Sequence, residues 1–305
     1  MIFNVPKRVL REYISKSELR VFSEKIKVRL SKELAEKYDN GSYNNYLSNM
    51  QKCLDMIDTL NIQYPGNAHP VLYVYIVPDN SYSELLRIPK IFDKGAGGGK
   101  PVPCYDLDGF NSAYGLSQNI LENRPEEETK ISRIENEIHE LSHIVHSQFF
   151  STHQTICEGF AETLPLYALD FEEIFDEHRN TIIELDESQI ISAQELLNSE
   201  KKGIYGAGAV LPNRSCSFRF SYISSYLLVR GCVETIAEKN NFSKAQAIQK
   251  FLEIVKQSNC SNEWLIYDIA NSIGIPQDEL LNGKHLQMKV LTSLSTQVQK
   301  SKFSK

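Results

Sequence analysis

Two histidines four residues apart, with a glutamate directly after the first, lie in the segment HELSH at residues 139–143. A helix turns by about 100° and rises by about 1.5 Å per residue, so His139 and His143 differ by about 40° around its axis and about 6 Å along it. Both imidazoles can therefore reach one point beside the helix. The spacing predicts that the pair binds a single metal ion.

Glu140 follows the first histidine directly, which places its carboxylate near a metal-bound water without making it a ligand. Zinc lowers the pKa of such a water toward about 7, and the carboxylate can take its proton and later deliver it to a leaving amine. The segment thus has the HExxH pattern of zinc hydrolases. Because HExxH fixes only three residues, it also arises by chance in long helical chains, and a second signal is needed.

That second signal is CEGFAE at residues 157–162, which begins 14 residues beyond His143. Glu158 and Glu162 are four residues apart and share one helix face, whereas the apolar residues of the segment gather on the opposite face. Two acidic side chains directed away from the core fit one metal ligand and one carboxylate that braces a ligand histidine. A solvated acidic face is the alternative explanation.

The helix that carries HELSH is predicted from about 125 to 150. Pro125 suits its first turn, and the glutamates at 126–128 complement the positive end of the helix. The apolar stripe centres about 140° around the axis from the two histidines, which therefore point away from the helix's own core face. Its members are Ile131, Ile134, Ile138, Leu141, Val145 and Phe149. A second helix is predicted from Thr155 to about Leu164, where Pro165 interrupts it.

The remaining elements predict an α+β fold. Apolar spacing indicates helices throughout residues 7–62, and the β-branched and aromatic run at 71–77 predicts a central strand, since both of its faces are apolar. Weaker strands are expected at 103–107 and 117–122. Four further helices are predicted at 218–238, 243–257, 262–273 and 286–299.

The chain is expected to divide into three regions. These are a helical part at 1–68, a central lobe with a small sheet at 69–170 and a mainly helical lobe at 171–305.

Composition narrows the class of protein. The 305 residues are 41% hydrophobic and 24% charged, an ordinary globular mixture. The longest apolar run has seven residues, far below the roughly 20 that cross a bilayer. A net charge of −6 disfavours nucleic acid as a partner. No secretory signal is visible at the start, so we expect a cytoplasmic protein whose six cysteines, none in a CxxC pair, are reduced thiols.

The glycine-rich segment KGAGGGK at residues 94–100 is the one feature that suggests phosphate binding. A phosphate-binding loop needs GxxxxGK followed by Ser or Thr, but Lys94 stands at the position of the first glycine and Pro101 at that of the hydroxyl. The segment is therefore interpreted as a mobile surface loop.

HELSH followed by EGFAE resembles the gluzincin metallopeptidases, which include thermolysin, the aminopeptidase N relatives and the clostridial collagenases. The resemblance covers residues 136–165 and implies a zincin-like catalytic lobe with a small mixed sheet. It implies one zinc ion per chain, bound by His139, His143 and Glu158, with Glu140 as general base and then acid. Glu162 then orients the first histidine.

Helix geometry alone leaves the third ligand open. If the helices were strictly antiparallel, His143 would lie about 9 Å before the turn between them, Glu158 about 4.5 Å after it and Glu162 about 10 Å after it. That arrangement favours Glu162, whereas the resemblance favours Glu158. The metzincin pattern HExxHxxGxxH is excluded, because His146 and Phe149 stand where it needs Gly and His. His146 and His153 are interpreted as rim or core histidines rather than ligands.

Gluzincins also use a Tyr or His from the C-terminal lobe to stabilise the oxyanion. By resemblance Tyr222 is the candidate, with Tyr226 and Tyr205 as rivals and a core aromatic residue as the plain alternative. Gln118 stands where the aminopeptidases carry the glutamate that binds a free amine, although Glu122 is near it. A neutral amide binds an ammonium group poorly, which argues against an aminopeptidase.

The predicted function is therefore that of a zinc-dependent peptidase acting on a peptide or protein. A metal-binding scaffold that recognises a protein without cutting it is one alternative; a structural site usually has four protein ligands and needs no base such as Glu140. A second alternative is a regulatory protease that resembles the ImmA/IrrE group and cleaves one partner. HELSHIVH is similar to that group, whereas the long C-terminal region is not.

Overall fold

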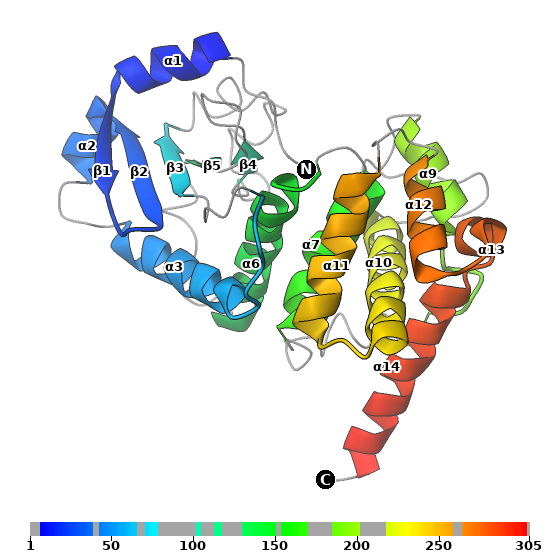
Figure 1. The fold of residues 1–305 in the computed structure, drawn as a ribbon. Coiled ribbons are helices and arrows are strands. Elements are labelled where there is room, and N and C mark those ends of the chain that lie inside the picture. The colour runs from blue at the N-terminus through cyan, green and yellow to red at the C-terminus, as the bar shows by residue number, and fades with distance from the viewer. Residues whose placement is uncertain are drawn as a thin grey trace. The chain divides into compact units, whose positions relative to one another are not determined.

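The computed structural model divides into two compact units, one formed by residues 1–59 and 63–148 and the other by residues 60–62 and 149–305 (Figure 1). The structure describes residues 7–38, 43–65, 71–78, 102–104, 113–117, 130–150, 154–169, 185–201, 218–258 and 264–303. Helices and a small mixed sheet make up these parts, so the predicted α+β class is confirmed. Within the described residues, no helix is both long and apolar enough to cross a membrane.

The first unit contains a five-stranded sheet of order β1-β2-β3-β5-β4. Its strands are β1 (Ser17–Val21), β2 (Ile26–Ser31), β3 (Leu72–Val77), β4 (Val102–Cys104) and β5 (Ala113–Ser117). β2, β3 and β5 run parallel, with Val74 opposite Val28 on one side and Tyr114 on the other, whereas β1 and β4 are antiparallel edges. β3 is therefore the central strand that its two apolar faces predict. β4 overlaps the expected strand at 103–107, and β5 ends at the first residue of the expected strand at 117–122.

The prediction of continuous helices over residues 7–62 is wrong for residues 17–31, which form the β1–β2 hairpin. Buried Ile26, Val28 and Leu30 alternate with half-buried residues along β2, which is the period of a strand. Since residues 26 and 30 also satisfy the i, i+4 spacing of a helix, the pattern is ambiguous when taken alone. Helices do flank the hairpin: α1 (Lys7–Ser15), α2 (Lys32–Lys37) and α3 (Asn44–Asp58).

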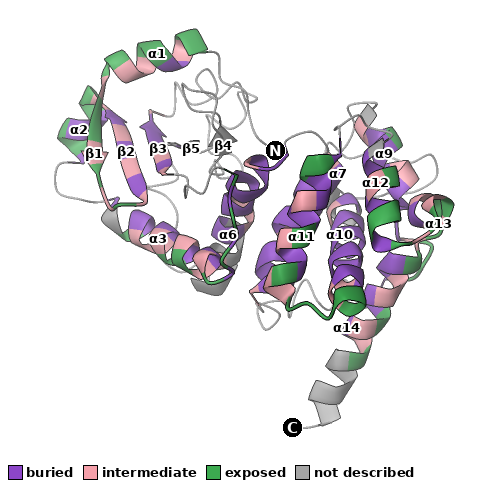
Figure 2. Cartoon of the chain, viewed as in Figure 1, coloured by how far each residue is buried: buried purple, intermediate pink, exposed green. Residues whose placement is uncertain are grey.

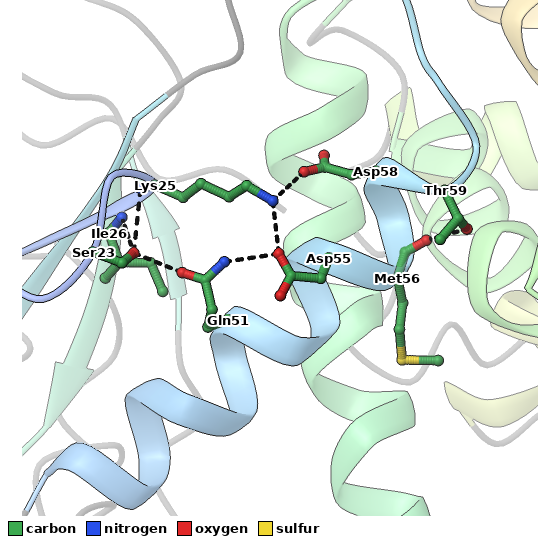
Figure 3. Close-up of polar contacts among 8 residues, drawn as sticks. All are labelled: Ser23, Lys25, Ile26, Gln51, Asp55, Met56, Asp58 and Thr59. Carbon is green, nitrogen blue, oxygen red and sulfur yellow. Dashed lines mark hydrogen bonds and ion pairs between the residues drawn. The ribbon is translucent and has the colours of Figure 1, made fainter.

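A polar cluster fixes the turn of this hairpin against α3 (Figure 3). The Ser23 hydroxyl accepts from the backbone N–H groups of Lys25 and Ile26, at 3.2 and 3.0 Å, and donates to Gln51 at 2.6 Å. The Lys25 ammonium donates to Asp55 and Asp58. Hydrogen bonds to these two carboxylates raise the pKa of Lys25. The turn is thus held by side chains that lie outside it in the sequence.

α6 (Lys130–Ser147) carries the HELSH segment and confirms the predicted helix over its described part. Ile138, Leu141 and Val145 of the predicted stripe are buried, at 0–3% exposed. α3 packs against α6, and the Cys53 thiol of α3 contacts the Ile134 carbonyl oxygen at 4.0 Å. The helix is therefore anchored in the first unit through its apolar face.

In the residues that the structure describes, the second unit consists of helices. They are α7 (Gln154–Thr163), the π-helical turn η2 (Leu164–Ala168), α9 (Ala193–Lys201), α10 (Phe218–Asn240), α11 (Lys244–Gln257), α12 (Trp264–Ile273), α13 (Gln277–Asn282) and α14 (His285–Phe303). α10 packs against α7, α9, α11, α12 and α14 and is buried along most of its length (Figure 2). All four helices predicted beyond residue 215 are confirmed, whereas α9 and α13 were not predicted.

Pro165 ends α7 as the sequence indicates, but the chain continues for one wide turn. Without an N–H group, Pro165 cannot donate to the carbonyl of Ala161, four residues before it. The Leu169 N–H group donates a hydrogen bond to the Leu164 carbonyl oxygen at 3.1 Å. This bond joins residues five apart, which is the pattern of a π-helix. The Thr163 hydroxyl donates to the Gly159 carbonyl at 2.6 Å and satisfies another acceptor near the helix end.

Three buried cysteines have free thiols, as predicted: Cys53, Cys157 and Cys232. Burial raises the pKa of the Cys232 thiol to about 12, so this thiol stays protonated and unreactive at neutral pH. The side chains of Cys104, Cys216 and Cys260 lie outside those that the structure describes.

Gly159 allows α7 to approach α10 closely, and we expect Gly159→Ala to destabilise the protein. A Cβ at this position would clash with the Ser225 carbonyl oxygen and the Val229 side chain. At an exposed helix position, replacing glycine by alanine raises the free energy of unfolding by up to about 1 kcal/mol. At this buried contact we expect the replacement to lower it by about 1–3 kcal/mol. Urea unfolding measures it, with exposed Lys256→Ala as control. Unchanged stability would show that the two helices can separate at no penalty.

Candidate metal centre

α6 presents the two histidines of the HELSH segment on one face. His139 is half-buried and His143 is only 1% exposed. Their ring centroids are 5.0 Å apart, and the ring planes are nearly perpendicular, at 88°. One helical turn thus brings the imidazoles as close together as the spacing predicts. Glu140, between them in sequence, is half-buried.

Glu158 lies in the second turn of α7 and is 2% exposed. The start of this helix is capped by Glu200 from α9, which accepts from the backbone N–H groups of Gln154 and Thr155 at 2.8 and 3.3 Å. The Thr155 hydroxyl donates to the same carboxylate at 3.2 Å. A carboxylate at a helix N-terminus satisfies backbone donors that otherwise have no partner in the helix. The cap therefore fixes the turn of α7 that carries Glu158.

The structure brings the three residues predicted as ligands together. One ligand atom from each of His139, His143 and Glu158 lies within 4.8 Å of the other two. Two metal bonds of about 2.0–2.2 Å span at most about 4.4 Å between ligand atoms, so small rotations of these side chains bring the three atoms onto one ion. These three residues can therefore hold one metal ion, with an imidazole, imidazole and carboxylate donor set.

The ligand group contains Glu158 and does not contain Glu162, although both are described. Glu162 lies one turn later on α7 and is half-buried. The position favoured by strictly antiparallel helices is therefore not the one found in the group. The role of Glu162 in orienting His139 stays a prediction.

Tyr222 lies in α10 and is half-buried. It precedes Ser225 by one turn, and the carbonyl oxygen of Ser225 is the atom that Gly159 of α7 approaches. Tyr222 is thus close along α10 to the turn of α7 that carries Glu158. Its role as an oxyanion donor stays a prediction.

The rival tyrosine on the same helix has a structural partner. Tyr226 is 2% exposed, and its hydroxyl accepts from Arg230 at 2.6 Å. The Arg230 guanidinium also donates to Glu234 at 2.8 Å and lies 4.9 Å from the centre of the Tyr167 ring. Tyr226 therefore contributes to a buried arginine cluster of the second unit. The other sequence candidates lie outside the described residues: Gln118, Glu122, His153, Tyr205 and the segment 94–100.

Glu137 is a buried carboxylate near the centre that the sequence analysis missed. It is 3% exposed and accepts from Tyr46 of α3 at 2.7 Å and from Tyr114 of β5 at 2.9 Å. Burial, followed by the charge of Glu137, raises the pKa of Tyr114 well above its ordinary value, so the hydroxyl keeps its proton and remains a donor. The two tyrosines thereby fix α6 two residues before His139.

We expect Tyr114→Phe to lower the free energy of unfolding by about 1–3 kcal/mol, because it removes a buried donor and leaves part of the Glu137 carboxylate unsatisfied. Urea unfolding at neutral pH measures this loss. Tyr73→Phe on neighbouring β3 is the matched control, since its ring keeps the contact with the Lys27 ammonium. Equal stability of the two variants would show that the hydroxyl of Tyr114 does not hold the helix.

His146 lies one turn after His143 and is also buried, at 1% exposed. Its Nε2 atom is 2.9 Å from Nδ1 of His143. It is not a member of the ligand group. The α6 helix ends at Ser147, one residue later.

In comparisons with protein-family models and with curated protein sequences, the chain matches none. The resemblance to gluzincins therefore depends on the segments of α6 and α7 described above. What the site establishes is a group of two histidines and one glutamate that can hold a metal ion.

Proposed function

We propose that this protein is a zinc-dependent peptidase in which Glu140 is the general base. The observation that supports it is the convergence of His139, His143 and Glu158, whose ligand atoms lie within 4.8 Å of one another. Glu140 directly follows the first of these ligands. Neither a chance HExxH match nor a solvated acidic face requires the three groups to meet.

The donor set fits a catalytic zinc ion. Catalytic zinc sites have three protein ligands, often two histidines and a glutamate, and keep one position open, whereas structural sites have four protein ligands. One carboxylate and two neutral imidazoles bring a single negative charge to an ion with two positive ones. A net positive centre therefore remains to attract the oxygen of a peptide carbonyl.

The residues of the chain divide the chemistry among them. A zinc ion held by His139, His143 and Glu158 would lower the pKa of a bound water toward about 7 and polarise the substrate carbonyl. Glu140 takes the proton of the attacking water and delivers it to the nitrogen of the leaving amine. Tyr222 donates a hydrogen bond to the negative charge that develops on the carbonyl oxygen. Glu162 accepts a hydrogen bond from His139 and keeps that ring in place.

The test is to incubate the zinc-loaded protein with a mixed peptide library and to read the cut positions by mass spectrometry. The proposal expects cleavage that stops when a chelator removes the metal and returns when zinc is added. Internal cuts identify an endopeptidase and terminal trimming an exopeptidase. A protein with one zinc per chain that cuts no peptide in the library would contradict the proposal.

A further inference from the structure

We propose that His146 is a positioning residue of the metal centre. In this proposal it accepts a hydrogen bond from Nδ1–H of His143 and so presents Nε2 of His143 to the metal. The proposal rests on the proposed zinc site, but it concerns the state of the histidine rather than peptide cleavage. The carrying observation is the contact between the two imidazoles on α6.

This contact is short and shielded from water. Nδ1 of His143 and Nε2 of His146 are 2.9 Å apart, an ordinary hydrogen-bond distance. Both residues are 1% exposed. Their ring centroids are 5.1 Å apart with ring planes at 83°, so one ring directs its nitrogen toward the edge of the other. Water cannot readily replace either partner, which makes the bond a lasting feature of the helix.

Binding of a metal through Nε2 of His143 requires one direction of this bond, and in the proposal that direction is already present in the metal-free protein. A neutral imidazole has one N–H donor and one nitrogen with a free lone pair. Since Nδ1 of His143 takes part in the bond, only Nε2 of that ring is left for a metal. Nε2 needs its lone pair to bind, so the proton is on Nδ1 and the Nε2 atom of His146 is the acceptor. The reverse direction puts the proton of His143 on Nε2 and prevents it from acting as a ligand.

The acceptor is unusual in being a second imidazole. Metal-binding histidines generally donate their second N–H to a carboxylate, a backbone carbonyl or a water. His146 orients the ring of His143 without adding a negative charge, so Glu158 remains the source of negative charge in the ligand group. An apolar residue at 146 would remove this acceptor for the Nδ1–H group of His143.

The experiment compares two replacements of similar size. His146→Gln keeps an acceptor oxygen near the position of Nε2, whereas His146→Met has no comparable acceptor. Zinc affinity, measured by competition with a chelator, is expected to fall about 10–100-fold in His146→Met and to be largely restored in His146→Gln. Exposed His285→Met is the control and should bind zinc as the wild type does.

A second readout uses neither metal nor substrate. Nitrogen NMR of the metal-free wild type at about pH 8.5, well above the ordinary pKa of histidine, should show the proton of His143 on Nδ1. A proton on Nε2, or an unchanged zinc affinity in His146→Met, would overturn the proposal, and the wild-type spectrum decides the matter even if a variant fails to fold. If zinc binding depends on His146 but no peptide is cut, the peptidase proposal fails and this one stands.

Discussion

Replacing Glu140 by glutamine is expected to leave zinc bound and to lower peptide hydrolysis by about 10²–10⁴-fold. Glutamine has nearly the same shape as glutamate, but its neutral amide cannot take a proton from the attacking water. Glu140 is not a member of the ligand group, so the metal should be retained. Zinc content per chain and the turnover of a peptide selected from the library measure the two halves of the prediction.

The matched control is Glu24→Gln, the same change at an exposed position of the β1–β2 turn. It should alter neither zinc content nor turnover. If purified Glu140→Gln kept the turnover of the wild type, Glu140 would not be the general base. Loss of zinc in that variant would instead make Glu140 part of the binding site, and the proposed division between ligands and base would be wrong.

Most of the helical framework could be predicted because its signals are local. α6 and α10–α12 have apolar residues at helical spacing over three or more turns, and Pro165 marks the end of α7. β3 could be predicted as central because both of its faces are apolar. The six-residue α13 gave no signal, since fewer than two turns are too short to show a period.

The hairpin at residues 17–31 could not be predicted because the choice between helix and strand was made by distant parts of the chain. Ile26 and Leu30 fit either period. β2 becomes a strand by pairing with β3, with Val28 opposite Val74, and its turn is held by side chains of α3. The tertiary contacts, rather than the local pattern, therefore decided the outcome.

The candidate site also has parts that the sequence predicts and parts that depend on tertiary contacts. The convergence of His139 and His143 follows from helix geometry, whereas the choice of Glu158 over Glu162 needed the fold. Glu137 could not be recognised because Tyr46 and Tyr114, which bind it, are 91 and 23 residues away in sequence. The sequence near Glu137 gives one sign of its burial. On the α6 helix, Glu137 lies about 80° around the axis from the centre of the apolar stripe, at the border of that stripe.

His143→Ala is expected to abolish zinc binding, because it removes one of only three ligands that the chain supplies. The loss in affinity should exceed the 10–100-fold loss expected for His146→Met, since an outer residue only orients a ligand. Chelator competition and metal analysis after dialysis measure both variants, with exposed His285→Ala as control. Peptide hydrolysis should disappear together with the metal.

The order of these effects tests the assignment more strictly than either variant alone. If His143 is the ligand and His146 orients it, affinity should decrease from wild type through His146→Met to His143→Ala, and the double variant should be no weaker than His143→Ala because the orienting bond has already been lost. Removing His143 also takes a hydrogen-bond partner from buried His146, so the metal-free variant should unfold about 1–3 kcal/mol more easily. One zinc per chain retained after His143→Ala would refute the ligand assignment, whereas equal affinities of the two single variants would place His146 among the ligands.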